Sequence, residues 1–400
     1  MKHTDKTSKS SRTVKPPNID QVSGVLILTA VAFALFAANS SLAGWYTVLH
    51  HTPIRVGVAP YQLDEPLIVW INQGLMTLFF LLVGLEIKQE LVAGHLSTLR
   101  TAALPAIAAI GGMAVPAAIF VALNLTNGEA LRGWAVPTAT DIALALAALS
   151  LLGNRVPTAL KAFVMALAIF DDIGAVIIIA AFYGEEIQSA PLMVAVLTYV
   201  VLVALNRFNV ARPVPLVILG AILWLALLRS GIEAALAGVL IASVVPHEAK
   251  KHHGQTLLRR TERALHPWAS LLIVPLFGFF NAGVAIETST LGNLDIGVAT
   301  GVIFGLFIGK QAGIFGATWC AVRLGVGVLP DEVKFVHIYG AALLAGIGFT
   351  MALFITQLAF ETSHLAATAR IAILLGSSLS GMAGLWVLWK AGRVAVSDFR

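Results

Sequence analysis

The sequence predicts an all-α membrane protein that crosses the bilayer about twelve times. Of its 400 residues, 58% are hydrophobic and only 12% are charged, whereas soluble proteins carry roughly 25% charged residues. The mean hydropathy is +0.87, so the chain lacks the polar surface that a soluble protein of this length needs. Apolar runs close to the length of a transmembrane helix recur along the chain. These observations exclude an ordinary soluble domain.

The apolar runs define the predicted helices in chain order. They cover residues 22–42, 66–87, 101–123, 135–152, 158–182, 191–205, 213–228, 231–245, 267–286, 297–322, 336–360 and 366–389. Strands of a membrane β-barrel would be about 10 residues long and would alternate with polar residues, a pattern that is absent from this sequence. Run length therefore favours helices over strands.

The distribution of basic residues predicts the orientation. Twelve crossings place both termini on one side, and that side holds 21 of the 26 Lys and Arg residues, against about 4 on the other. Because basic loops stay in the cytoplasm, we expect both termini and the basic loop 247–266 to be cytoplasmic. We interpret this loop as a topology signal and not as a nucleic-acid site. The polar segment 1–20 is expected to be a cytoplasmic tail before an uncleaved first helix.

The chain shows neither a linker nor a low-complexity tract, so residues 1–400 are predicted to form one transmembrane domain. Its single cysteine, Cys320, excludes an intrachain disulfide framework and a Cys-based metal site. Cys320 is expected to be a small packing residue within its apolar run.

A few ionisable residues interrupt the apolar runs, and each one is costly at membrane depth. The deep ones are Asp141, Asp171, Asp172, Glu233 and Lys310. Asp171 and Asp172 are adjacent, so on a helix they point about 100° apart and can line one cavity. One buried lysine cannot neutralise both carboxylates. A proton or a cation must supply the remaining compensation, which predicts a proton or cation site.

The chemistry of this pair favours exchange over permanent binding. Two neighbouring carboxylates are expected to titrate as a coupled unit, and their hard oxygen atoms favour hard cations. We infer a monovalent cation, because a divalent ion would bind a dicarboxylate too firmly to be released. Glu233 lies in a different run, near its outer boundary, where it is expected to be solvated.

Helix-breaking residues accompany the buried charges. Pro137, Thr138 and Thr140 directly precede Asp141 in the fourth run, and Gly346 and Gly348 lie at the centre of the eleventh. Broken helices in a bilayer require protein or water to satisfy the freed backbone groups. Two opposed breaks would place helix ends near mid-membrane. Asp141 could compensate the positive ends, and Lys310 could compensate the negative ends.

At these residues the sequence resembles the NhaA family of sodium/proton antiporters, over roughly residues 20–390. The resemblance rests on blocks that occur in the family's order: LFFLLVGLEIKQEL at 78–91, GWAVPTATDIALA at 133–145, ALAIFDDIGAVIIIA at 166–180, PLFGFFNAGV at 275–284, GLFIGKQAGI at 305–314 and AGIGFTMALFI at 345–355. It implies two inverted repeats at about 101–182 and 297–389, with two discontinuous crossing helices. The remaining spans would form a panel that mediates homodimerisation.

The resemblance also implies site residues and an activity. Asp172 matches the principal cation ligand, and Asp171 matches the carboxylate that pairs with a lysine, here Lys310. Thr140 and Asp141 match residues beside the site. Family members expel Na⁺ or Li⁺ from bacteria across the inner membrane. They use the inward proton gradient, work electrogenically and without a cofactor, and become active at alkaline pH.

A pH-response region is implied by the residues Glu86, Glu90, Glu262 and His266. This chain departs from the family pattern nearby: Gln89 stands where an arginine is common, Arg263 where a histidine occurs, and Glu233 at a position that can be histidine. Because histidine titrates near neutrality and glutamate does not, the activation pH of this chain stays open.

Other functions fit the sequence less well. Exchange of another monovalent cation, K⁺ included, stays open. A passive channel would need repeated coordinating rings, which the sequence lacks. An aspartyl protease would need two carboxylates that face each other from different elements, and adjacent residues on one helix fit that poorly. We therefore expect a transporter and not an enzyme.

Overall fold

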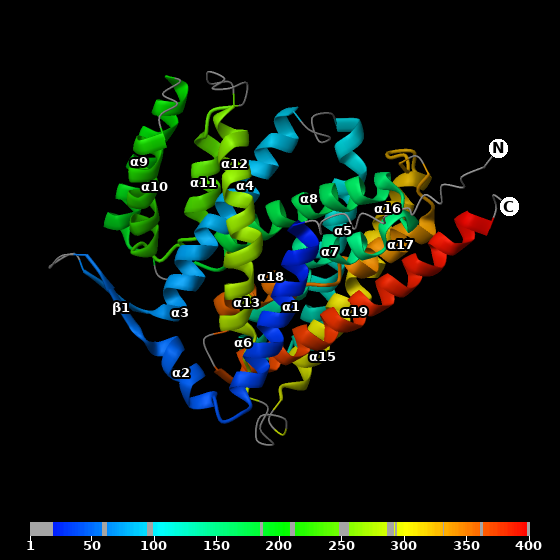
Figure 1. The fold of residues 1–400 in the computed structure, drawn as a ribbon, viewed down its shortest axis with the longest axis horizontal. Coiled ribbons are helices and arrows are strands. Elements are labelled where there is room, and N and C mark those ends of the chain that lie inside the picture. The colour runs from blue at the N-terminus through cyan, green and yellow to red at the C-terminus, as the bar shows by residue number, and fades with distance from the viewer. Residues whose placement is uncertain are drawn as a thin grey trace, which may run out of the picture.

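The computed structural model describes residues 19–57, 62–93, 99–184, 187–208, 213–247, 256–285, 292, 294–330, 332–360 and 363–397. Within these residues the chain forms a bundle of helices with one small hairpin (Figure 1). Most of the predicted tail 1–20 and part of the basic loop 247–266 lie outside the described residues. The all-α class is confirmed.

The first part of the chain contains helices on both sides of the hairpin. Its elements are α1 (Ile19–Ala38), α2 (Ala43–His51), β1 (Pro53–Val56), β2 (Leu63–Pro66), α3 (Leu67–Val69), the π-helical turn η1 (Trp70–Leu75) and α4 (Met76–Ala93). The strands pair antiparallel, with Pro53 opposite Pro66. Figure 1 shows this hairpin at the edge of the bundle. An exposed ion pair of 2.9 Å joins Arg55 on β1 to Asp64 on β2.

The middle of the chain is helical. They are α5 (Leu99–Asn124), α6 (Gly128–Leu131), the 3-10 segment η2 (Arg132–Thr138), α7 (Ile142–Leu151), the 3-10 turn η3 (Gly153–Arg155), α8 (Thr158–Phe182), α9 (Ser189–Arg207), α10 (Pro213–Leu228) and α11 (Leu236–Val244). The last part comprises α12 (Leu257–Trp268), the π-helical turn η4 (Ala269–Ile273), α13 (Val274–Ala282), α15 (Ile296–Phe304), the π-helical turn η5 (Gly305–Gly309), α16 (Lys310–Arg323), α17 (Phe335–Leu344), α18 (Phe349–Ala359) and α19 (Ser363–Ser397).

The described residues contain nine helical segments long and apolar enough to cross a membrane, and the bent pair α17 and α18 makes a tenth. Two other predicted runs contain helices shorter than these spans: α10 has 16 residues and α11 has nine. Helix is present in each of the twelve runs, but the count of twelve complete spans stays a prediction. The chain is a multi-pass membrane protein.

One predicted boundary is wrong for a physical reason. We expected the ninth helix to start at residue 267, but a continuous helical segment runs from Leu257 to Ala282. Its first part, α12, is amphipathic: Leu258 is buried, whereas the arginines on the other face are exposed. A search for all-round apolar runs misses such a helix. The last ten residues of the predicted basic loop are therefore helical.

The helices pack in two groups. Figure 1 shows α9, α10, α11 and α4 on the left, and α16, α17 and α19 on the right. We call α1, α3–α4 and α9–α13 the panel, in which α4 packs on α11 and α12, α10 on α9, and α1 on α13. We call α5–α8 and α15–α19 the repeat body, in which α5 packs on α16, α8 and α15, and α19 packs on α17 and α15. The inverted relationship between the repeats stays a prediction.

Small residues let α5 and α16 approach closely. A Cβ atom on Gly111 would collide with the Gly313 carbonyl, and one on Gly313 would collide with Gly111. Glycine is required at both positions for this backbone contact. The approach sets the position of Lys310, which lies one turn before Gly313 and is fully buried. Cys320, on the same helix, is exposed, so the packing role that we expected for it is wrong.

Candidate cation site

Two broken helices meet inside the bundle. The chain is extended at Ala139 (φ −77°, ψ 148°) and at Asp141 (φ −89°, ψ 98°), between η2 and α7. The second break separates α17 from α18, whose axes differ by 48°. Pro137 and the glycines Gly346 and Gly348 lie at these breaks, as the sequence predicts. The expected pair of discontinuous helices is confirmed.

Direct hydrogen bonds join the two breaks. The Asp141 N–H donates to the Ile347 carbonyl at 2.6 Å, and the Thr140 hydroxyl donates to the Ala345 carbonyl at 2.8 Å. Ala345 directly follows the last residue of α17, where carbonyl groups lack helical partners. The freed backbone groups of one break are thus satisfied by residues of the other.

The Asp141 carboxylate caps two half-helices at once. One oxygen accepts the Leu144 N–H of α7 at 3.0 Å. The other accepts the Thr350 N–H at 3.1 Å and the Thr350 hydroxyl at 2.6 Å, both from α18. Both contacts lie at helix N-termini, where partial positive charge favours an anion. Both carboxylate oxygens are therefore engaged by these helix ends. Sequence reasoning missed Thr350, which is a hydroxyl residue in the first turn after the break.

Ser377 supplies a second cap to α18. Its hydroxyl oxygen, on α19, accepts the N–H groups of Gly348 at 3.2 Å and Phe349 at 3.3 Å. Together with Asp141, it satisfies three successive N–H groups at the start of α18. The side chain is buried, so water does not replace it readily. No local motif identified Ser377, because its partners lie nearly 30 residues away.

We expect Ser377→Ala to destabilise the protein by about 1–2 kcal/mol, because two buried N–H groups lose their acceptor. Thermal unfolding in detergent measures this loss. Ser380→Ala is the matched control: it lies one turn further along α19, is equally buried, and makes one hydrogen bond of 3.3 Å to the Leu306 carbonyl. An equal loss in both variants would contradict a special role for Ser377.

Lys310 forms a buried ion pair with Asp171. The Nζ atom lies 2.8 Å from one carboxylate oxygen and 3.1 Å from the other. Lys310 is fully buried and Asp171 is 5% exposed, so the pair is removed from water. The described hydrogen bonds of Lys310 both go to Asp171, and compensation of helix ends by Lys310 stays a prediction.

Asp172 differs sharply from its neighbour. It is buried, with 3% exposure, and its Oδ2 atom has no hydrogen-bond partner among the residues that the structure describes. Buried carboxylate oxygens rarely lack a partner, because desolvation of such a group is costly. Asp172 lines a cavity of about 330 Å³, whereas Asp171 is not among the lining residues. The two adjacent carboxylates on α8 thus differ: Asp171 pairs with Lys310, and Asp172 lies at the cavity wall.

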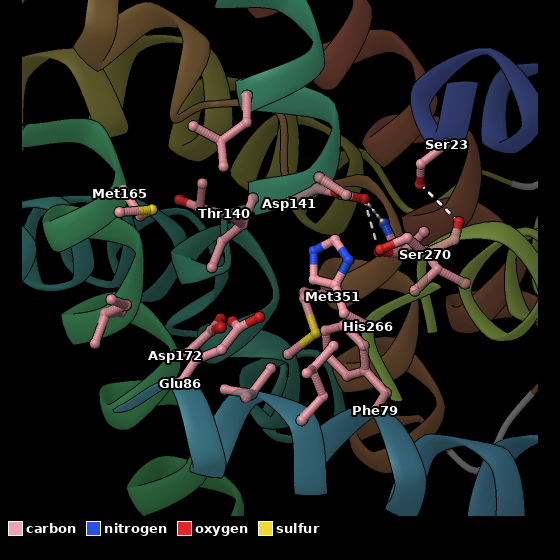
Figure 2. A pocket seen from close by; sticks show the side chains of 18 of the residues that line it. Ser23, Phe79, Glu86, Thr140, Asp141, Met165, Asp172, His266, Ser270 and Met351 are labelled. Carbon is pink, nitrogen blue, oxygen red and sulfur yellow. Dashed lines mark hydrogen bonds between the residues drawn. The ribbon is translucent and has the colours of Figure 1, made fainter. Parts of the chain in front are cut away.

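The cavity brings the other predicted residues together. Figure 2 shows Asp172 and Glu86 on one part of the wall, with Thr140, Asp141, His266 and Met351 around the same space. Glu90, Glu262 and Gln89 also line it. These residues lie toward the end of α4 and the start of α12, the side predicted to be cytoplasmic. The four residues assigned to pH response are therefore wall residues of the cavity that holds Asp172.

Glu233 lies elsewhere. It is only 7% exposed, so the expectation that it is solvated is wrong. The chain makes a tight turn at Gly231 (φ 82°) before α11, and the Glu233 carboxylate turns back to accept the Ala235 N–H at 3.3 Å. This local turn covers the carboxylate. Glu233 is not a lining residue of the cavity.

A buried carboxylate with one unpaired oxygen, beside two broken helices and a buried ion pair, defines the class of ion-coupled secondary transporters. Most of the chain matches that class in the comparisons with known proteins. Residues 17–388 match the family model described as Na⁺/H⁺ antiporter 1, and the chain belongs to this family.

The chain is similar to Na⁺/H⁺ antiporters named NhaA in several bacteria. It is 45% identical over 368 residues to that of Sulfurovum sp., covering 91% of this chain and 94% of the relative. It is 47% identical to that of Rhodospirillum rubrum, with 92% and 95% covered, and 48% identical to NhaA 2 of Pseudomonas syringae pv. tomato, with 92% and 93% covered. The resemblance predicted from the sequence blocks is confirmed.

Proposed function

We propose that the protein exchanges Na⁺ or Li⁺ for H⁺ across the bacterial inner membrane, with Asp172 as the residue that binds either ion. The observation that carries this proposal is the buried Asp172 carboxylate, whose Oδ2 atom lacks a partner at the wall of a cavity. A proton or a monovalent cation satisfies such an oxygen, and the two compete for it. The names of the similar antiporters support the same pair of substrates.

The surrounding residues have separate roles in this proposal. Asp141 belongs to the proposed cation and proton site, where its carboxylate also compensates helix ends by accepting hydrogen bonds from α7 and α18. The Thr140 hydroxyl donates its hydrogen to Ala345, so its oxygen keeps a lone pair for a cation. Asp171 binds Lys310 in the present state. If Asp171 and Asp172 each carry a proton against one monovalent cation, the exchange moves net charge and is electrogenic.

A pH titration of transport tests this function. Na⁺, Li⁺ or K⁺ is added to inverted vesicles that hold a proton gradient, and proton efflux is followed by fluorescence dequenching. We expect Na⁺ and Li⁺ to release protons with saturable kinetics that strengthen as pH rises. A response to K⁺ alone would favour the alternative cation exchanger. Flux that does not saturate and needs no counter-gradient would indicate a passive channel.

Glu86 is proposed to set part of the pH response, together with Glu90, Glu262 and His266. Glu86 lies beside Asp172 at the cavity wall, so its negative charge acts on Asp172. In Glu86→Gln this negative charge is absent, so ionisation of Asp172 becomes easier and cations bind at lower pH. We expect the half-activation pH to fall by about half a unit or more, which corresponds to under 1 kcal/mol per half unit. The same vesicle titration measures it, and a shift toward higher pH would contradict the assignment.

The orientation and assembly are part of the proposal. Both termini are proposed to be cytoplasmic, because the basic residues at helix ends, such as Lys88, Arg155 and Arg207, fall on that side. The panel is proposed to mediate a homodimer within the lipid bilayer. The exposed apolar side chains of α9 and α10 support this, since that face packs on little else within one copy. No nucleic acid or cofactor takes part.

A further inference from the structure

Three amide side chains meet at one end of the bundle. Asn72 lies in η1, Asn281 lies in the last turn of α13, and Gln357 lies in the last turn of α18. The Asn72 side-chain amide donates to the Gln357 oxygen at 2.6 Å and to the Asn281 oxygen at 3.3 Å. The Asn281 amide donates back to the Asn72 oxygen at 2.8 Å. We call these three residues the outer amide cluster.

The outer amide cluster lies at the opposite end from the cavity. Asn72 precedes Glu86 by 14 residues on a continuous helical segment, which corresponds to about 21 Å. Gln357 follows Thr350 by seven residues on α18, or about 10 Å. None of the three amides lines the cavity that holds Asp172. The cluster therefore lies toward the side opposite to the cavity opening.

An aromatic layer lies between the cluster and the site. Phe80, Phe277 and Phe354 come from the same three helical segments, each one or two turns closer to the cavity than the amide. The Phe354 ring centre lies 5.5 Å from that of Phe80 and 6.0 Å from that of Phe277. All three side chains are fully buried. The closed end thus has an apolar inner layer and a polar outer layer.

Both layers join the panel to the repeat body. Asn72 and Asn281 belong to the panel, and Gln357 belongs to α18 of the repeat body. Transport at one site requires that the site opens to each side in turn, by movement of one rigid body against another. When the outer end opens, the amides are separated in contact with water, which replaces their hydrogen bonds at little cost. An apolar contact at the same place would be more costly to separate in water.

We propose that the outer amide cluster is an outer gate, held closed while the cavity opens to the cytoplasm and broken each time Asp172 faces the outside. The inference rests on the proposed exchange at Asp172. It assigns Gln357, Asn72 and Asn281 to the conformational step of exchange and not to ion binding. Fixing Gln357 to Asn72 therefore stops transport without altering the cation site.

Cross-linking tests the gate directly. The single cysteine, Cys320, is first replaced in Cys320→Ser, and Asn72→Cys and Gln357→Cys are then combined in the full chain. A short thiosulfonate cross-linker with a cleavable disulfide joins the two thiols. We expect Na⁺/H⁺ exchange in vesicles to fall by at least about tenfold after cross-linking and to recover after reduction. Exchange that persists in cross-linked protein, or two cysteines that do not cross-link, would overturn the gate.

The matched control joins two residues of the panel. Asn72→Cys with Asn281→Cys receives the same reagent, and this link does not cross the moving interface. We expect exchange to stay within about twofold of its starting value. A loss as large as that of the Asn72–Gln357 pair would overturn the assignment of the gate to the interface between panel and repeat body.

A single variant gives an independent measurement if the double variant folds poorly. Gln357→Cys is labelled from the outside with a membrane-impermeant maleimide, with and without Na⁺ at alkaline pH. We expect cycling to raise the labelling rate several-fold, about threefold or more, and an unchanged rate would overturn the gate. Asp172→Asn in the same background should remove the Na⁺ effect. If the cysteine-free parent shows no exchange, the proposed function fails. Cross-linking of Asn72→Cys to Gln357→Cys still tests the contact between these two residues in that case.

Discussion

Asp172→Asn is expected to abolish Na⁺-driven proton flux while the protein still folds. The amide has almost the same shape as the carboxylate but carries no charge and releases no proton at physiological pH, so it neither compensates a cation nor exchanges one for H⁺. Asp172 is in none of the ion pairs of the described residues, so its replacement breaks none of them. We expect flux in inverted vesicles to fall by more than about a hundredfold, with thermal stability unchanged or raised.

The control for this variant is the same substitution at the surface. Asp64→Asn removes a carboxylate that is paired with Arg55 on the exposed hairpin, where an ion pair contributes little. Its flux should match that of the unmodified protein. Na⁺-dependent flux that persists in Asp172→Asn would move the cation site away from this residue, and Asp171 would then be the next candidate.

The sequence was most informative where chemistry is local. The adjacent Asp171 and Asp172 predict an ionisable site on one helix. We expected that both could line one cavity, whereas the structure pairs Asp171 with Lys310 and places only Asp172 at the cavity. Pro137 and the glycines near Gly346 predict breaks because backbone geometry acts within a few residues. Apolar runs predict membrane helices because the bilayer requires a fixed length.

Most contacts between distant segments were beyond sequence reasoning, and the Asp171–Lys310 pair was expected only from the family resemblance. Thr350 and Asp141 are 209 residues apart, and Asn72 and Gln357 are 285 residues apart, so no local pattern joins them. We expected Glu233 to be solvated because it lies near the end of an apolar run. The position in a run does not show whether a local turn buries the side chain. The helical start at Leu257 was missed because α12 buries only one face.

Lys310→Gln is expected to destabilise the bundle by about 3–5 kcal/mol, because it leaves the Asp171 carboxylate buried without a cation. Lys310 is fully buried and makes two short contacts to Asp171. Water therefore cannot solvate the Asp171 carboxylate after the ammonium group is removed. Thermal unfolding in detergent measures the loss, and exchange in vesicles should fall with it. Lys88→Gln is a matched control. The Lys88 ammonium donates to two carbonyl groups at 2.6 and 2.7 Å, so its replacement should cost about 1–3 kcal/mol.

A second substitution separates ion pairing from packing. In Lys310→Gln with Asp171→Asn both charges are absent, and the two amides can hydrogen-bond to each other. Since removal of a whole buried pair is often nearly neutral, the double variant should regain most of the stability that Lys310→Gln loses. Exchange should stay low if Asp171 carries one of the protons, because the amide cannot release one. Equal losses of stability in the single and double variants would show that Lys310 stabilises the bundle through its packing and not through its charge.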